Sequence, residues 1–223
     1  MKLISVNVGL PREVLHKGRM VETGIFKESV AGRVQARRLN LDGDRQADLS
    51  VHGGESKAIY VYPSEHYGYW RRELPGVDLP WGMFGENFTT QGLLEDQANI
   101  GDRFRVGSAE VMVTEPRLPC YKLGVKFRRE DIVKRFLRSG RTGFYMAVLQ
   151  EGEVGAGDVI VRIGRDRNEV AVPDITRLYV TANYNQTDLE MLKRVAGLEP
   201  LPESWRHYFA EKLQLIAGRS RSA

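Results

Sequence analysis

The sequence contains a single cysteine, Cys120, among 223 residues. One cysteine excludes an intrachain disulfide framework and any zinc or iron–sulfur centre built from several cysteines, and it agrees with a reducing compartment. No apolar run approaches the roughly 18 residues that a membrane helix needs, so no membrane partner is predicted. The first residues, MKLISVNVG, alternate polar and apolar side chains and indicate a strand, not a signal peptide. We therefore expect a cytoplasmic protein.

Several common site signatures are also missing. There is no Walker A pattern and no G-x-G-x-x-G, so ordinary nucleotide-binding folds have no support. The segment His52-Gly53-Gly54 is similar to an esterase oxyanion loop, but the G-x-S-x-G nucleophile elbow is absent. A cysteine hydrolase that uses Cys120 and His52 remains a formal alternative.

The charge of the chain is weakly positive and unevenly distributed. The net charge is +4, which hints at an anionic partner. Between Lys126 and Arg141 there are seven basic residues against two acidic ones. Residues 164–223 hold nine Lys and Arg against eight Asp and Glu, a net of +1 that is too small for a phosphate-binding face. We therefore predict no nucleic-acid partner.

Hydrophobic patterning divides the chain near residue 164. Before this point short alternating or apolar runs, bounded by glycine, proline and aspartate, predict antiparallel hairpins that close into a barrel or sandwich. These runs are residues 2–8, 57–62, 103–106, 109–113, 144–149 and 159–163, with helices expected at 65–74, preceded by Ser64 as the candidate N-cap, and at 130–137. Three helical patterns follow at 173–179, 188–196 and 202–217. We predict a mainly β, α+β domain over residues 1–163 and a small three-helix domain over residues 164–223.

The lone cysteine lies in the stretch PRLPCYKL, residues 116–123. Pro119 fixes its own φ and biases the residue before it toward extended geometry, so we expect a stiff loop. Arg117 and Lys122 flank Cys120 closely. Nearby cations favour the thiolate, which is the form that ligates a metal or attacks an electrophile. A buried structural cysteine is the alternative.

A second stretch, GDRQADLSVHGG, occupies residues 43–54. It is rich in carboxylates, but an EF-hand loop here would lack the glycine and the glutamate required at its sixth and twelfth positions. Two glycines follow His52 and allow the backbone to approach a ligand closely. Turn and capping roles are the alternative for Asp44 and Asp48, and a core hydrogen bond is the alternative role for His52.

A third stretch, WGMFGENFTTQG, occupies residues 81–92. Gly82 and Gly85 permit unusual backbone angles, and the polar side chains of residues 86–90 suit the polar edge of a heterocycle or a phosphate. A tight hairpin loop around a buried Phe84 is the alternative interpretation.

Taken in order, and together with KAIYVYPSEHYGYW and NIGDRF, the three stretches resemble the MOSC domain, specifically its YiiM-type bacterial branch. The resemblance covers roughly residues 1–163. The three helical patterns that follow resemble the small three-helix domain found after MOSC in that branch. The ordered set is far more specific than any one stretch.

The resemblance implies a MOSC-type β-barrel with peripheral helices that binds the molybdenum cofactor, in which the dithiolene of a phosphorylated pterin holds the metal. The cysteine of the family motif P-R-x-P-C ligates the molybdenum, and here that residue is Cys120. A soft thiolate suits such a metal. Related MOSC proteins reduce N-hydroxylated compounds, and this branch is linked to N-hydroxylated purines such as 6-hydroxylaminopurine.

The resemblance also assigns roles to other residues. His52 would line the metal pocket and could deliver a proton when the N–O bond breaks. The implied cofactor-binding residues are the basic Lys27, Lys57 and Arg117, which would hold the phosphate and stabilise charge at the metal, and Glu86, Asn87 and Thr89, which would contact pterin or phosphate.

The predicted function is therefore reduction of an N-hydroxylated small molecule to its amine and water. No flavin, haem or iron–sulfur signature is present, so the electrons would come from a separate reductase or electron-transfer protein. The basic stretch between Lys126 and Arg141 could dock such a protein, and a solvated helix face is the alternative. A sulfur carrier that uses a Cys120 persulfide is the alternative function. The three-helix segment would dock a partner, act as a lid or form a homodimer.

Overall fold

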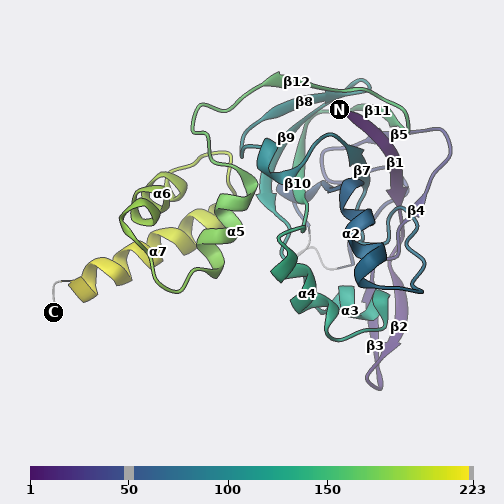
Figure 1. The fold of residues 1–223 in the computed structure, drawn as a ribbon. Coiled ribbons are helices and arrows are strands. Elements are labelled where there is room, and N and C mark those ends of the chain that lie inside the picture. Colours follow the sequence, from purple (N-terminus) through teal and green to yellow (C-terminus); the bar gives the residue numbers. More distant parts are fainter. Residues whose placement is uncertain (48–52, 221–223) are drawn as a thin grey trace.

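The computed structural model describes residues 1–47 and 53–220. Its centre is an eight-stranded sheet with the order β12-β8-β9-β10-β6-β7-β1-β4 (Figure 1). These strands are β1 (Lys2–Val8), β4 (Glu28–Ser29), β6 (Ile59–Pro63), β7 (Phe88–Gln91), β8 (Arg103–Val106), β9 (Ala109–Pro116), β10 (Phe144–Gln150) and β12 (Ile160–Gly164). The β6–β7 pair is parallel, and the other pairs in this described sheet are antiparallel.

The predicted mainly β, α+β fold is confirmed, but within the described residues the sheet is not closed into a barrel. A single isolated bridge between Lys2 and Val159 links the beginning of β1 to the residue before β12. The other end of β1 pairs with β4 through Asn7 and Val8. Only the first residues of β1 are therefore available to pair near β12, and no continuous ladder of hydrogen bonds joins the two strands.

Two short antiparallel pairs lie outside this sheet. The hairpin of β2 (Arg12–His16) and β3 (Arg19–Thr23) projects from the lower end of the molecule in Figure 1. β5 (Arg33–Ala36) pairs with β11 (Gly152–Gly155), and neither strand is among the runs predicted from the sequence.

The helices include every one that the sequence predicts. They are α2 (Glu65–Glu73), α3 (Tyr121–Phe127), α4 (Ile132–Ser139), α5 (Val172–Val180), α6 (Gln186–Ala196) and α7 (Glu203–Ser220), with short 3-10 turns η1 (Glu55–Lys57) and η2 (Glu95–Gln97). Ser64 precedes α2, but its side chain does not cap the helix. α3, in contrast, begins inside the predicted stiff loop. In the described part of the chain, no helix has the length and apolar character to cross a bilayer.

The buried side chains form two clusters. The larger fills the inside of the sheet and continues into α5, α6 and α7 through residues such as Val172, Leu192 and Phe209. The division into two domains at residue 164 therefore stays a prediction. The second cluster is aromatic and lies between β6 and helices α2 and α4; its rings include Tyr62, Trp70, Phe84 and Phe136. This aromatic cluster packs against the functional site described below.

Candidate functional site

Cys120 occupies a junction between a strand and a helix. β9 ends at Pro116, and Cys120 is the N-cap residue of α3, with extended backbone angles of φ −115° and ψ 173°. The amide of Arg117 donates to the carbonyl oxygen of Gly143 (3.2 Å), just before β10. The loop is therefore fixed at both ends by regular elements, and the thiol is half-buried.

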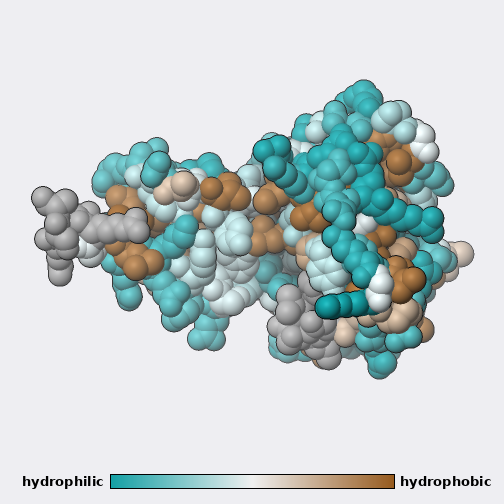
Figure 2. Space-filling model, turned by 90° about the horizontal axis from the view of Figure 1, so that it is seen from below, coloured by the Kyte–Doolittle hydropathy of each residue, from teal (hydrophilic) through white to brown (hydrophobic). Residues whose placement is uncertain are grey.

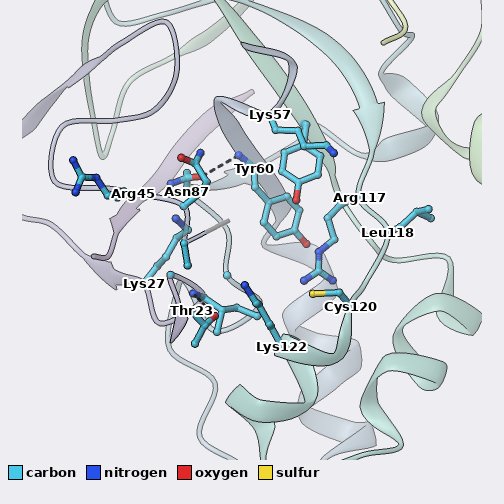
Figure 3. A pocket seen from close by; sticks show the side chains of 16 residues that line it. Thr23, Lys27, Arg45, Lys57, Tyr60, Asn87, Arg117, Leu118, Cys120 and Lys122 are labelled. Atoms are coloured by element: carbon cyan, nitrogen blue, oxygen red, sulfur yellow. Dashed lines mark hydrogen bonds between the residues drawn. The ribbon is translucent and has the colours of Figure 1, made fainter. Parts of the chain in front are cut away.

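Cys120 opens into a cavity between the sheet, α3 and the segment that follows β3 (Figure 3). Five basic residues line this cavity: Lys27, Arg45, Lys57, Arg117 and Lys122. No aspartate or glutamate is among the described lining residues. A wall with this excess of positive charge favours an anion, and several of its donors are able to hydrogen-bond phosphate oxygens. We name this space the basic cavity.

Arg117 is the most unusual of the five cations because it is only 5% exposed. Its guanidinium lies 5.2 Å from the ring centroid of Tyr60 and 5.1 Å from that of Phe136. Within the part of the chain that the structure describes, no carboxylate forms an ion pair with it, and Nη1 is buried without a hydrogen-bond partner. Figure 3 shows the guanidinium beside the sulfur of Cys120. A buried donor in this state is well placed to bind an anionic group.

Lys27 is also buried, but it has a carboxylate partner. Its Nζ forms an ion pair with Asp44. Burial lowers the pKa of Lys27, and the charge of Asp44 opposes that shift. Asp44 also accepts hydrogen bonds from the amide of Gly9 (2.9 Å) and from Nδ2 of Asn87 (2.9 Å). Asp44 is thus the structural residue of its stretch and holds Lys27 and Asn87 in the cavity wall.

Asn87 and Lys57 lie on the cavity wall as well. The Asn87 side chain accepts from the amide of Tyr60 through Oδ1 (3.0 Å), the bond drawn in Figure 3. Lys57 is the last residue of η1, and its Nζ is 3.8 Å from Oε2 of Glu115. The structure therefore brings Lys27, Lys57 and Asn87, which lie far apart in the sequence, onto the same cavity wall as Arg117 and Cys120.

Glu86 and Thr89, by contrast, are fully buried behind the cavity. The Glu86 carboxylate accepts hydrogen bonds from the hydroxyl of Tyr67, the amides of Gly82 (2.8 Å) and Phe84 (3.1 Å), and the hydroxyl of Thr89 (2.9 Å). Burial raises the pKa of Glu86, and the Tyr67 bond opposes the shift. Both side chains are used inside the protein to fix the loop, and neither is among the described residues that line the cavity. Their contact with pterin or phosphate stays a prediction.

His52 lies outside the described residues, and its predicted roles in proton delivery and in lining the metal pocket remain predictions. Among the residues that are described, no group of three or more His, Cys, Asp and Glu side chains is arranged to hold a metal ion.

Sequence reasoning missed Arg45, Tyr60 and Tyr145 as cavity residues. Arg45 lies inside the second stretch, yet only tertiary structure brings it to the cavity that Cys120 also lines. A Cβ atom at Gly24 would lie 2.4 Å from the carbonyl oxygen of Arg45, so the two backbone segments approach each other only because residue 24 is glycine. The sequence feature that could have indicated this close approach was therefore Gly24, not Arg45.

The basic stretch between Lys126 and Arg141 is not a continuous charged face. The Nζ of Lys126 points inward and donates to the carbonyl oxygens of Ile25 (2.9 Å) and Gly82 (2.5 Å). Burial lowers the pKa of Lys126 to about 8. Arg129 and Arg135 form ion pairs with Asp131 and Glu73, whereas Arg128, Lys134 and Arg138 are exposed.

Comparison with known proteins places these residues in context. The sequence matches the MOSC domain family over residues 48–161. The uncharacterized protein YflK of Bacillus subtilis is 39% identical over 94% of this chain and 93% of its own length. Protein YiiM of Escherichia coli is 35% identical over 82% of this chain and 81% of its own length.

A protein named reductase from Gibberella moniliformis is 34% identical over 74% of this chain, and the match spans 30% of that longer protein. Among solved structures, the crystal structure of YiiM from Geobacillus stearothermophilus superimposes with a TM-score of 0.79 at 34% identity. That match covers 95% of this chain and 98% of the other.

Proposed function

Because this chain belongs to the MOSC domain family, we propose that it binds the molybdenum cofactor and reduces N-hydroxylated small molecules to amines. The observation that carries the proposal is the position of Cys120 beside Arg117, a buried cation whose Nη1 has no partner among the described residues. The relative named a reductase supports the reductive direction.

The residues of the basic cavity fit the cofactor chemically. Its phosphate is an anion, and the unpartnered donor of Arg117 together with Arg45 and Lys122 offers charge-assisted hydrogen bonds on a wall that has no described carboxylate. Cys120 supplies a soft thiolate, a suitable ligand for a molybdenum that already bears sulfur. When bound, the cofactor would supply a metal that stores two electrons and passes them to the N–O bond.

The chain itself would hold and orient the reactants. Arg117 would keep a positive charge next to the Cys120 sulfur. Lys27, fixed by Asp44, and Lys57 would add to the anion-binding wall. His52 remains the proposed proton donor for the leaving oxygen.

The overall reaction is R–NHOH + 2e⁻ + 2H⁺ → R–NH₂ + H₂O. We propose that a separate reductase or electron-transfer protein delivers the electrons. Three exposed cations, Arg128, Lys134 and Arg138, remain available for an acidic partner. Reversal of Lys134 and Arg138 to glutamate should lower the partner-coupled rate and its salt dependence while leaving the rate with a small chemical donor unchanged. Equal rates with the protein donor would exclude docking at this site.

The central test combines metal content with activity. The protein should be purified from cells that make the cofactor and from cells that do not, and reduction of 6-hydroxylaminopurine should be followed with dithionite-reduced methyl viologen as the electron donor. The wild type from cofactor-producing cells should contain molybdenum and form adenine.

Cys120→Ala should lose the activity, and Cys120→Ser separates the loss of the sulfur from a change in volume. Full activity in the alanine variant would eliminate the ligand assignment. Sulfane sulfur on Cys120 without molybdenum would instead support the sulfur-carrier alternative.

A further inference from the structure

A second hollow adjoins the basic cavity on the side of the C-terminal helices. This groove has a volume of about 380 Å³ and shares Lys57, Leu118, Cys120 and Tyr145 with the basic cavity. In Figure 1, α5 lies beside the sheet near β9, and in Figure 2 the outline is indented where the C-terminal helices meet the sheet body. The volume falls in the range that holds small organic ligands. Cys120 therefore lies at the junction of two spaces that differ in chemistry.

Three aromatic side chains from the C-terminal helices form the far end of the groove: Tyr179 of α5, and Trp205 and Tyr208 of α7. The ring centroids of Tyr179 lie 5.4 Å from those of both Trp205 and Tyr208, and Trp205 lies 6.4 Å from Tyr208. Tyr179 is 38% exposed despite its size. We name this set the aromatic corner. Contacting rings with open surface are suited to stacking on a planar ligand.

The aromatic corner is fixed relative to Cys120. Trp205 donates from Nε1 to Oε2 of Glu115 (2.8 Å), and Ser56 donates to Oε1 of the same carboxyl group (3.0 Å). Glu115 is on β9, the strand that leads into Cys120. Burial raises the pKa of Glu115, and the nearby Lys57 opposes that shift. A rigid strand thus sets the separation between the aromatic corner and the thiol.

Using these contacts, we infer that the C-terminal helices complete the substrate site, with Tyr179 and Tyr208 as specificity-determining residues that hold the flat ring of the substrate. The inference rests on the proposed function and extends it by assigning a task to α5 and α7. The cations of the basic cavity receive the anionic end of the cofactor on one side of Cys120. The aromatic corner receives the substrate ring on the other side, which directs the N-hydroxyl group toward Cys120.

The polar side chains that line the groove agree with this arrangement. Glu115 and Ser204 both line the groove and offer hydrogen-bonding groups to the edge of a heterocycle. Because stacking on aromatic side chains tolerates different ring systems, the corner would select for planarity and leave the exact pattern of ring nitrogens to these polar groups.

The test compares an aromatic with a non-aromatic substrate. Tyr179→Leu and Tyr208→Leu remove the ring and keep apolar bulk, and Tyr69→Leu on α2 is the matched control, since Tyr69 lines neither space. For 6-hydroxylaminopurine, kcat/KM of the two groove variants should fall by roughly 5- to 100-fold, mainly through KM, which is the range expected for a lost stacking contact. For acetamidoxime, which has no ring, kcat/KM should stay within about twofold, as should all values for the control. Equal losses for both substrates, or no loss for either, would overturn the inference.

A binding measurement separates this inference from the proposed function. Adenine, the amine product, is titrated into the cofactor-free chain and followed by calorimetry and tryptophan fluorescence. The wild type and Tyr69→Leu should bind with similar Kd, and the groove variants should bind at least about 5-fold more weakly. If the loaded wild type reduces neither substrate, the proposed function fails, and the adenine titration still decides the role of the aromatic corner. Unchanged adenine binding in both groove variants would refute that role.

Discussion

Replacement of Arg117 by methionine should have little effect on the stability of the cofactor-free chain while removing anion binding. Arg117 is 5% exposed and has no carboxylate partner among the described residues, so its burial carries a desolvation cost of several kcal/mol. The rings of Tyr60 and Phe136, at 5.2 and 5.1 Å, each return up to about 2 kcal/mol through cation–π attraction. These contributions nearly cancel. Methionine has a similar length and no charge, so we expect the unfolding free energy to change by only about 1 kcal/mol.

Anion binding should clearly distinguish the wild type from Arg117→Met. Inorganic phosphate that binds the folded chain at 100 times its Kd adds about 2.7 kcal/mol of stability. For a protein of this size that corresponds to a rise in Tm of about 5–10 °C. Phosphate should therefore stabilise the wild type and have a much smaller effect on Arg117→Met. Arg105→Met is the control, because Arg105 is exposed on β8 and pairs only at the surface with Glu110.

The measurements are urea unfolding without phosphate and thermal unfolding across a phosphate series at constant ionic strength. If Arg117→Met lowers the unfolding free energy by more than about 3 kcal/mol without phosphate, the loss matches that of a broken buried ion pair. That result would refute the argument that the desolvation cost of Arg117 and its cation–π attraction nearly cancel. An equal phosphate response in all three proteins would refute Arg117 as the anion-binding donor.

Three further predictions concern the frame of the site. Glu86→Gln should lower the unfolding free energy by about 1–3 kcal/mol at neutral pH, because an amide cannot accept all four hydrogen bonds; an unchanged value in urea unfolding would contradict this. Gly24→Ala should lower the unfolding free energy by about 1–3 kcal/mol, because the added Cβ would clash with the carbonyl oxygen of Arg45. Gly68→Ala in α2, where the added Cβ meets nothing within 4 Å, should raise it by about 0.5–1 kcal/mol. Equal effects of the two substitutions would refute the steric argument. Burial lowers the pKa of Lys126 from 10.5 to about 8, so between these pH values the unfolded chain holds a proton on Lys126 that the folded chain has lost. The unfolding free energy should therefore rise with pH across this range, by at most about 3 kcal/mol. Lys126→Met should lack this rise, and identical pH dependence of the two proteins would exclude the pKa shift.

Much of the site could be predicted because its residues lie in short stretches with recognisable local chemistry. Gly82 and Gly85 were expected to adopt unusual backbone angles, and their φ values are +82° and +85°. The alternating pattern of residues 2–8 correctly indicated β1. β7 was missed because its residues 88–91 belong to a polar stretch, yet Phe88, Thr89 and Thr90 are all buried. α3 was missed because its seven residues are too few to show a helical period.

The roles of individual polar residues could not be read from their type. Glu86 and Asn87 are adjacent in the sequence, but Asn87 reaches the basic cavity and Glu86 turns into the interior. Likewise, Lys126 and Arg138 belong to the same basic stretch, and only Arg138 is exposed. Which way a side chain points depends on the element that carries it and on what packs against that element.

The sequence by itself determined that this protein has one cysteine, a mainly β core and three C-terminal helices, because composition and hydrophobic periodicity are local properties of the chain. Tertiary structure decided that Arg117 is buried without a carboxylate partner among the described residues, and that Trp205 contacts Glu115 across 90 positions. Such facts depend on which distant segments meet, and therefore on the packing of the whole sheet against its helices. The cysteine and its flanking cations were visible in the sequence, but the burial of Arg117 and the aromatic corner at the far end of the groove were not.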